Sequence, residues 1–203
     1  MTKKWLRERE RDPYYRRAKS EGYRSRAVYK LFQISKRYKL IKEGAVIVDL
    51  GAFPGGWIQG ASFLVGKEGY VLGIDLKKID PFTQPNVKTM VGDLTKLEVS
   101  EIIKRLPRRP DVIISDMSPN ISGVWELDHI KQIDLAKKSL EIGIKLLNKG
   151  GNFLVKVFQG ELFNNFHNDV KSKFSYTKIV KPKATRKRSS EVYIVALNFE
   201  FND

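Results

Sequence analysis

The stretch AVIVDLGAFPGGW, residues 45–57, sets the fold of the central part of the chain. It begins with a short apolar run that fits one buried strand, and it leads into residues whose spacing fits a helix. Between the two, Gly51, Gly55 and Gly56 allow a tight turn and let a ligand approach the backbone closely. The stretch therefore predicts a strand, a ligand-binding loop and a helix in succession.

The same alternation of strand and helix continues on the C-terminal side. Strands are predicted at residues 45–50, 70–75, 87–91, 111–115 and 152–158, and helices at residues 57–65, 95–106, 128–147 and 161–173. Apolar strands separated by helices are typical of a parallel, doubly wound α/β sheet. Near the C-terminus, two strands at residues 176–181 and 191–201 are separated only by a basic loop at residues 182–190. Because that loop leaves no room for a crossover helix, we expect one antiparallel strand there.

Before residue 43 the pattern is helical. Asp12 and Pro13 form a typical cap and first-turn pair, and Gly22 is a suitable stop for this first helix. Ser25 is placed to cap a second helix, whose apolar residues recur at helical spacing. We therefore predict a helical N-terminal extension in front of the α/β core.

The net charge of +15, from 38 Lys and Arg against 23 Asp and Glu, is unevenly distributed over the 203 residues. Residues 1–42 carry 15 basic and 4 acidic side chains and residues 171–191 carry 8 and 1, whereas residues 43–170 carry 15 and 16. Two basic ends around a neutral centre favour a polyanion as partner, because each neutralised phosphate releases a counterion. The alternative is a basic surface kept for solubility.

The composition excludes several classes of protein. A hydrophobic share of 41% is enough for a folded core, which excludes general disorder. The longest apolar runs are too short to span a bilayer, and the basic N-terminal residues lack the apolar stretch of a secretory signal. The absence of cysteine from the sequence excludes disulfides and thiolate metal sites and fits a cytoplasmic protein. His129 and His167 lie on separate predicted helices without a ligand spacing, so no metal site is expected.

The loop after the first strand indicates the ligand class. A dinucleotide fingerprint G-x-G-x-x-G would need glycine at position 53, which is Phe53, and the sequence holds no Walker motif. Asp75 ends the second strand and can bond to ribose hydroxyls, and Asp93 ends the third, where it can bond to an adenine edge. Each acid can instead cap the next helix. Together with Gly51 they favour a nucleoside ligand, and S-adenosylmethionine suits the loop better than NAD does.

Two further residues are candidates for chemistry. Asp116 stands at the carboxyl end of a buried strand, the edge at which open α/β sheets bind ligands. Lys156 interrupts an apolar strand, where a lone ammonium is costly to desolvate, so it either extends to water or faces a polar site. By themselves, Lys30 fits a solvated helical lysine and Glu191 a strand-end charge. Spacing alone proposes Asp116 and Lys156 as a pair and does not connect Lys30 or Glu191 with them.

Five motifs in order along the chain resemble those of the FtsJ/RrmJ-type ribose 2′-O-methyltransferases. They are Gly22–Ala27 with Tyr29–Leu31, Val48–Ala52 with Pro54–Trp57, Ser115–Met117 with Pro119–Asn120, Val155–Gly160, and Arg188–Ser189 with Glu191–Tyr193. The resemblance spans roughly residues 5–200. One departure is Phe53, which replaces the small residue usual in the loop and is expected to reshape the floor of the donor pocket.

The resemblance implies a seven-stranded, Rossmann-like methyltransferase sheet, S-adenosylmethionine as methyl donor and a ribose 2′-hydroxyl in RNA as acceptor. It implies a catalytic tetrad at Lys30, Asp116, Lys156 and Glu191. It assigns donor binding to Gly55, Trp57, Asp75, Asp93 and Asp116, beside Gly51 from the loop. We therefore expect one methyltransferase domain, residues 1–203, with a basic helical extension (1–42) and a donor-binding catalytic core (43–203).

The expected function is methylation of a uridine ribose in large-subunit ribosomal RNA by a monomeric, cytoplasmic enzyme. In this hypothesis the neutral amine of Lys156 takes the ribose proton, Lys30 favours that neutral form or holds the ribose, and the two carboxylates orient the amines. Because carboxylates favour a charged amine, the alternative is that Lys156 only steers the hydroxyl. Phosphate contacts are expected from the basic loop and from Lys3, Lys4, Arg7, Arg16, Arg17, Arg24 and Arg26, with stacking or packing by Tyr14, Tyr15 and Tyr23.

Three other functions stay open at this point. Ribose methylation of a transfer RNA anticodon loop is the nearest, since it implies the same fold and tetrad. A non-catalytic RNA-binding or ribosome-assembly protein is disfavoured by the intact tetrad. An NAD-linked oxidoreductase is disfavoured by Phe53 and Pro54 in the glycine loop.

Overall fold

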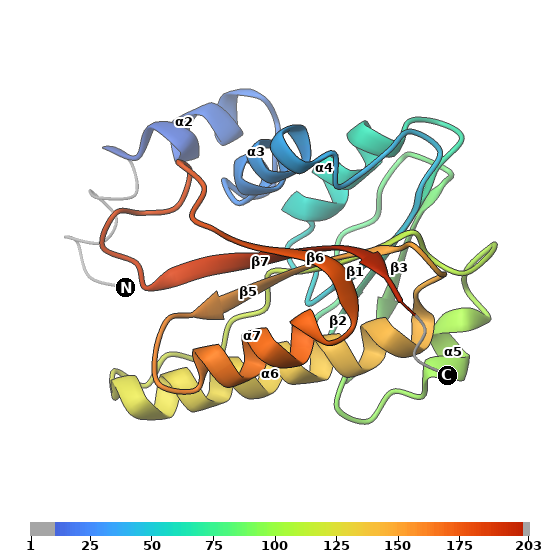
Figure 1. Ribbon diagram of the computed structural model, residues 1–203. Helices are drawn as coiled ribbons and strands as arrows, with labels where there is room; N and C mark the ends of the chain where they lie inside the picture. Colours follow the sequence, from blue (N-terminus) through green and yellow to red (C-terminus); the bar gives the residue numbers. More distant parts are fainter. Residues whose placement is uncertain (1–10, 201–203) are drawn as a thin grey trace.

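The computed structural model describes residues 11–200, which form a seven-stranded sheet with helices on both faces (Figure 1). The strands are β1 (Val46–Leu50), β2 (Tyr70–Asp75), β3 (Val87–Val91), β4 (Val112–Ser115), β5 (Asn152–Phe158), β6 (Phe174–Val180) and β7 (Glu191–Phe199). Their order is β3-β2-β1-β4-β5-β7-β6, and every pair is parallel except β5 with β7 and β6 with β7. The predicted, mostly parallel sheet with one antiparallel strand near the C-terminus is confirmed.

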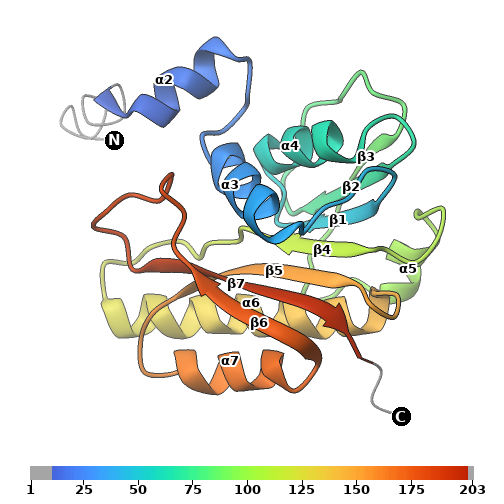
Figure 2. The same cartoon turned by 45° about the horizontal axis from the view of Figure 1, so that its top comes forward.

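Two groups of helices enclose the sheet. On one face lie α3 (Val28–Tyr38) and α4 (Gly56–Val65), and on the other lie α5 (Val99–Ile103), α6 (Trp125–Leu146) and α7 (Phe163–Lys171) (Figures 1 and 2). α2 (Pro13–Ser20) lies beyond α3, beside the loop between β6 and β7. This is the doubly wound arrangement that the strand–helix alternation predicts.

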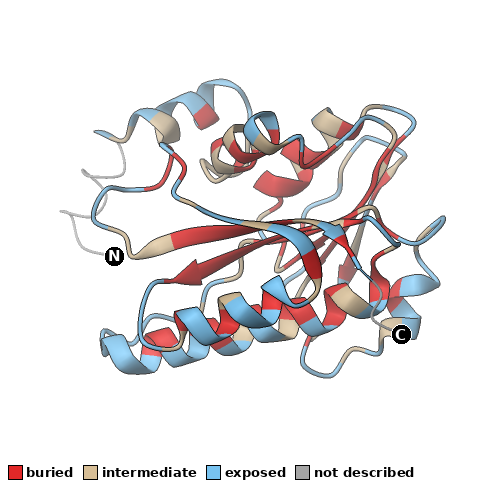
Figure 3. Cartoon of the chain, in the orientation of Figure 1, coloured by how far each residue is buried: buried red, intermediate tan, exposed pale blue. Residues whose placement is uncertain are grey.

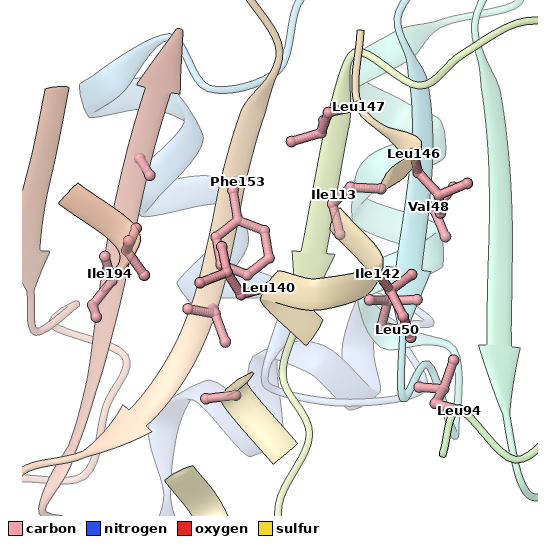
Figure 4. Packing of buried hydrophobic residues seen from close by; sticks show 14 of the residues in the cluster. Val48, Leu50, Leu94, Ile113, Leu140, Ile142, Leu146, Leu147, Phe153 and Ile194 are labelled. Carbon is pink, nitrogen blue, oxygen red and sulfur yellow. The ribbon is translucent and has the colours of Figure 1, made fainter. Parts of the chain in front are cut away.

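Each face of the sheet has its own apolar cluster, because side chains alternate along a strand. Val48 and Leu50 of β1 belong to the cluster under α6, whereas Ile47 packs under α3 and α4. Phe153 of β5 and Ile142 of α6 belong to the first cluster (Figure 4), and burying a side chain of this size contributes about 1.5–3 kcal/mol. Figure 3 shows the result, with buried strands at the centre and exposed outer helix faces.

The N-terminal helices agree with the sequence in part. Asp12 caps α2 by accepting hydrogen bonds from the backbone N–H groups of Tyr14 and Tyr15, and Gly22 follows the helix with a φ of 74°. Ser25 does not cap α3, which begins at Val28. Its hydroxyl accepts from the N–H of Ala27, in a turn ahead of the helix, so the predicted start was too early. Residues 1–10 of the predicted extension lie outside the described residues.

Three other helices differ from their predicted lengths by more than one residue, and the first of them, α7, is two residues shorter at each end than the predicted 161–173. The helix predicted at 95–106 shortens to α5, because Asp93 accepts hydrogen bonds from the N–H and hydroxyl of Thr95 and holds a turn there. The helix predicted at 128–147 begins earlier, at Trp125, because Asp128 binds the N–H groups of Ser122 and Gly123 from inside the first turns. The predicted last strand ends at Phe199, and residue 201 lies outside the described residues.

Candidate functional site

One edge of the sheet gathers the polar residues. The parallel strands β1 to β5 all end at this edge, and β7, which runs the other way, begins at it. Glu191, the first residue of β7, therefore pairs with Phe158, the last residue of β5, and Tyr193 pairs with Lys156. Asp116 follows β4 at the same edge. The antiparallel strand β7 thus brings the side-chain carboxylate of Glu191 to the ligand-binding edge of the sheet.

The structure brings together the four residues of the implied tetrad. Lys30, in the first turn of α3, donates from Nζ to Glu191 Oε1 at 2.6 Å. Lys156 Nζ lies 3.2 Å from Asp116 Oδ1 and donates to the backbone oxygen of Asp116 at 2.6 Å. The four side chains are between 6% and 19% exposed, so both ion pairs lie largely out of water. Buried charges of this kind need partners, and these four supply them to one another.

Tyr193 joins the two ion pairs into one cluster. Its fully buried hydroxyl lies 2.7 Å from Asp116 Oδ1 and 3.0 Å from Glu191 Oε1, and it accepts from Lys30 Nζ at 3.1 Å. Burial, and then the charges of Asp116 and Glu191, raise the pKa of Tyr193 well above its ordinary value, so the phenol keeps its proton as a donor. Sequence reasoning missed this residue. The available signal was strand alternation, which puts Tyr193 on the same face as Glu191.

The Asp116 carboxyl is ionised. Burial alone would raise its pKa, but the charges of Lys156 and Lys30 and the hydrogen bond from Tyr193 lower the pKa below its ordinary value. The carboxylate can therefore only accept hydrogen bonds. It fixes the amine of Lys156 at the sheet edge, where a substrate hydroxyl could meet it.

Replacing Tyr193 with phenylalanine removes the one hydroxyl within residues 11–200 that touches both ion pairs, and it keeps the aromatic packing against Trp57. We expect the methyl transfer that the family resemblance implies to slow by about tenfold, equivalent to one lost hydrogen bond to a charged group. Single-turnover kinetics measure this effect, with Tyr176→Phe on the exposed surface of β6 as the matched control. A Tyr193→Phe enzyme as fast as wild type would show that the two ion pairs act independently.

The donor cleft lies beside the tetrad, at the ends of β1, β2, β3 and β4. Its cavity has a volume of about 510 Å³, within the usual range for small-molecule sites. The lining includes Gly51, Phe53, Asp75, Asp93 and Asp116. Asp116 therefore belongs to both the cleft and the tetrad. Its partner Lys156 consequently lies next to any ligand bound in the cleft.

Asp75 and Asp93 line the cleft and also stabilise local turns. Asp75 accepts from the N–H groups of Phe53 at 2.9 Å and Lys77 at 2.8 Å, while Asp93 accepts from Thr95. The capping role and the ligand-facing role proposed for these acids thus coexist, because each carboxylate has about four acceptor positions. Phe53 is 47% exposed and forms a wall between the cleft and a smaller cavity next to Asp49.

Gly51, Gly55 and Trp57 shape the glycine loop in different ways. Gly51 has a φ of 76°, and a Cβ there would lie 2.0 Å from the side chain of Met117, so this position requires glycine. Gly55, with a φ of 104°, lines neither cavity and instead packs against Arg24 and Phe82. Trp57 is buried and donates its indole N–H to the backbone oxygen of Ala27 at 2.8 Å. Gly51 therefore faces the ligand site, and Gly55 holds the loop in position. Trp57 does both, because it lines the smaller cavity and also ties the loop to the start of α3.

Asp49 is the second functional candidate that sequence reasoning missed. Its side chain is 1% exposed and lines the smaller cavity, and neither carboxylate oxygen has a hydrogen-bond partner among the described residues. Burial, and then the charges of Asp116 and Asp75, raise its pKa well above the ordinary value. A cation with N–H donors would satisfy these oxygens. S-adenosylmethionine carries a sulfonium and an ammonium group. Asp49 in the smaller cavity and the acids of the adjoining donor cleft therefore fit it.

Two arginines of the basic extension are engaged within the protein. Arg26 pairs with Asp12 and donates to the backbone oxygen of Ala184, and Arg24 donates to the backbone oxygens of Asp80 and Pro81 at 2.8 and 2.9 Å. These two arginines therefore fix α3 to neighbouring loops. Tyr14 and Tyr23 pack against Tyr29, with ring centroids 5.5 and 5.9 Å apart, as packing residues do. Lys3, Lys4 and Arg7 lie outside the described residues.

The described residues hold neither a metal-binding cluster nor a membrane-spanning helix. Within residues 11–200, no group of His, Cys, Asp and Glu side chains could hold a metal ion. None of the helices in that range is long and apolar enough to cross a membrane.

The chain is similar to proteins of one known family. The model of the FtsJ-like methyltransferase family matches residues 23–199. A protein of Methanococcus vannielii named ribosomal RNA large subunit methyltransferase E is 48% identical over 198 residues, which cover 97% of this chain and 76% of the relative.

Solved structures share the fold. A Plasmodium falciparum protein described as a ribosomal RNA methyltransferase superposes with a TM-score of 0.77 and 30% identity, covering 87% of this chain and 98% of the other. Fibrillarin of Aeropyrum pernix, solved with S-adenosylmethionine, superposes with a TM-score of 0.58 at 17% identity, covering 86% of this chain and 75% of the other. At that identity the second match concerns the fold alone.

Proposed function

Because this chain belongs to the FtsJ-like methyltransferase family, we propose that it transfers a methyl group from S-adenosylmethionine to a ribose 2′-hydroxyl of large-subunit ribosomal RNA. The chain is an S-adenosylmethionine-dependent methyltransferase. The observation that carries the proposed acceptor is the buried cluster of Lys30, Glu191, Tyr193, Asp116 and Lys156, which shares Asp116 with the donor cleft. Two amines beside the donor suit an uncharged hydroxyl that must be aligned and deprotonated.

The proposal includes several finer points. The acceptor is a uridine, the enzyme is a monomer of one domain over residues 1–203, and it acts in the cytoplasm. Gly51, Trp57, Asp75, Asp93 and Asp116 contact the donor, and so does Asp49, which lines the smaller cavity together with Trp57. Gly55 supports the loop. The net charge of +15 supports an RNA partner, because exposed basic residues neutralise phosphates.

The reaction requires the residues to align the hydroxyl and to remove one proton. When bound, S-adenosylmethionine supplies an electrophilic methyl group on a positive sulfonium. In its neutral form, Lys156 would bind the 2′-hydroxyl and take its proton at Nζ, so that the oxygen could accept the methyl group. Lys30 holds the ribose, and Asp116 and Glu191 keep the two amines in place.

Transfer of labelled methyl groups tests the proposed acceptor. We expect label from S-adenosylmethionine to enter large-subunit ribosomal RNA, given either as naked RNA or as the assembled subunit, and not transfer RNA. Alkaline hydrolysis then maps the position, because a 2′-O-methyl group blocks cleavage of the adjacent phosphodiester. The Asp134→Asn enzyme, altered at an exposed site on α6, is a positive control. Label on a base, or on transfer RNA alone, would contradict the proposal.

A further inference from the structure

Five exposed apolar side chains occur within ten residues where the chain enters α6. Ile121, Val124, Trp125, Leu127 and Ile130 are between 42% and 63% exposed. We call residues 121–130 the apolar lip. In Figures 1 and 2 this end of α6 lies across the sheet edge from the loop between β6 and β7. Exposed apolar side chains that gather in a segment beside a site are candidates for contact with its ligand.

Trp125 connects the apolar lip to the tetrad. Its indole stacks on Phe158, with ring centroids 6.0 Å apart and planes 23° apart, and on His129 at 5.8 Å and 20°. Phe158 is the direct strand partner of Glu191. The indole therefore stacks on the strand partner of a tetrad residue, and 43% of Trp125 stays exposed to solvent.

The residues next to Trp125 are held by hydrogen bonds and close packing. His129 accepts at Nε2 from the N–H of Leu162 at 3.1 Å, and its ring lies so close to Gly160 that a Cβ there would approach within 2.7 Å. Asp128 binds the loop ahead of the helix through Ser122 and Gly123. The lip is thus a preformed surface, which lowers the entropy cost of binding.

The apolar lip is also continuous with the donor cleft. Ser118, Pro119 and Asn120, which precede it directly, line that cleft. The surface therefore runs from the methyl donor, past the ends of β4 and β5, to Trp125. A substrate whose ribose enters the tetrad has its neighbouring groups beside this lip.

The opposite side of the edge has the complementary chemistry. Lys183, Arg186, Lys187 and Arg188 of the loop between β6 and β7 are exposed, whereas the exposed side chains of the lip are mainly apolar. Single-stranded RNA presents phosphates on one side and flat base surfaces on the other. A strand lying along this edge would meet basic groups with its phosphates and apolar groups with its bases.

The burial of the tetrad also favours unpaired bases. Because its side chains are at most 19% exposed, a ribose reaches them only if its nucleotide leaves the stack of its neighbours. The bases that lose this stacking need another surface. We propose that the apolar lip binds an unpaired nucleobase next to the target ribose, with Trp125 as the stacking partner; this inference rests on the function proposed above.

Three variants separate stacking from mere apolar contact. Trp125→Phe keeps an aromatic ring, Trp125→Leu keeps apolar bulk without a ring, and Phe63→Ala removes another exposed aromatic, on α4. We expect Trp125→Leu to raise the KM for RNA by about tenfold, a typical cost of losing one base–aromatic stack, with donor affinity unchanged. Trp125→Phe and Phe63→Ala should stay within about twofold of wild type, since one keeps a ring and the other lies elsewhere.

RNA with abasic nucleotides identifies what the tryptophan touches. In oligonucleotides with an abasic residue on either side of the target, we expect wild type to lose about tenfold in RNA affinity at one position. Trp125→Leu should be insensitive to that same change, because the contact is already gone. Anisotropy measures binding without turnover, and thermal melting confirms that each variant is folded.

The outcomes distinguish this inference from the proposed function. The stacking role would be overturned if Trp125→Leu bound and methylated RNA like wild type. It would also be overturned if the abasic nucleotide lowered the RNA affinity of Trp125→Leu as much as that of wild type. Either result would leave the methylation proposal intact. Wild type binding RNA but placing no methyl on ribose would overturn the proposed function, while the abasic comparison by anisotropy would still decide on Trp125.

Discussion

Replacing Lys156 with alanine is expected to lower the rate of methyl transfer by about two to four orders of magnitude, the usual contribution of a general base. The reason is that Lys156 Nζ is the amine next to Asp116, which lines the donor cleft, so its loss removes the group that aligns and deprotonates the hydroxyl. Donor affinity should change little, because Lys156 does not line the cleft. Single-turnover methylation and calorimetric titration of S-adenosylmethionine measure the two quantities.

A second substitution separates proton removal from steering. Lys156→Arg keeps a positive charge but cannot accept a proton near neutrality, so it should be nearly as inactive as Lys156→Ala. Lys178→Ala, which removes an exposed lysine from β6, is the matched control and should behave as wild type. Substantial activity in folded Lys156→Arg would mean that the amine only orients the hydroxyl. Turnover close to wild type in Lys156→Ala would remove Lys156 from the mechanism.

Replacing Asp116 with asparagine is expected to slow methyl transfer by at least about a hundredfold and to destabilise the fold by about 3–5 kcal/mol, the range for breaking a buried ion pair. The substitution keeps shape and removes charge, so Lys156 loses its carboxylate in a site where it is 5% exposed. The hydrogen bond from Tyr193 would then meet a neutral acceptor. Urea unfolding and single-turnover kinetics give the two effects.

The loss of stability should depend on pH in a defined direction. Because the pKa of Asp116 is lower in the folded protein than in the unfolded chain, its carboxylate stabilises the fold above the unfolded pKa of about 4. That contribution is lost as the pH falls through the lower, folded pKa. The stability gap between wild type and Asp116→Asn should therefore be largest near neutrality and shrink in acid. A gap that is constant with pH, or equal to that of the exposed control Asp134→Asn, would contradict the ion-pair account.

The strand–helix pattern predicted much of the fold correctly. Apolar strands and intervening helices are local features, so β1 to β5 and the missing crossover before β7 could be identified from residue order. Helix ends were less certain, because they depend on single contacts such as that of Asp128 with the loop ahead of α6. Residue order likewise could not show that Ser25 would lie in a turn before α3.

The site was predicted less evenly. Asp116 and Lys156 stood out as polar residues on buried strands, whereas Lys30 and Glu191 joined them only through the family resemblance. Tyr193 and Asp49 passed unnoticed, since a tyrosine and an aspartate near strand ends usually have ordinary roles. Their significance depends on surroundings that are distant in sequence. Tyr193 contacts the two ion pairs, and the carboxylate oxygens of Asp49 lie at a cavity without a hydrogen-bond partner among the described residues.

The sequence by itself determined the strands, the glycine loop and the uneven charge, because each depends on residues close together in the chain. The tertiary structure decided which charges meet. Glu191 lies more than thirty positions after Lys156, and the two come together because β7 runs antiparallel to β5 and so begins where β5 ends. Lys30 joins them because α3 packs over that edge, so that each buried charge finds its partner only in the folded chain.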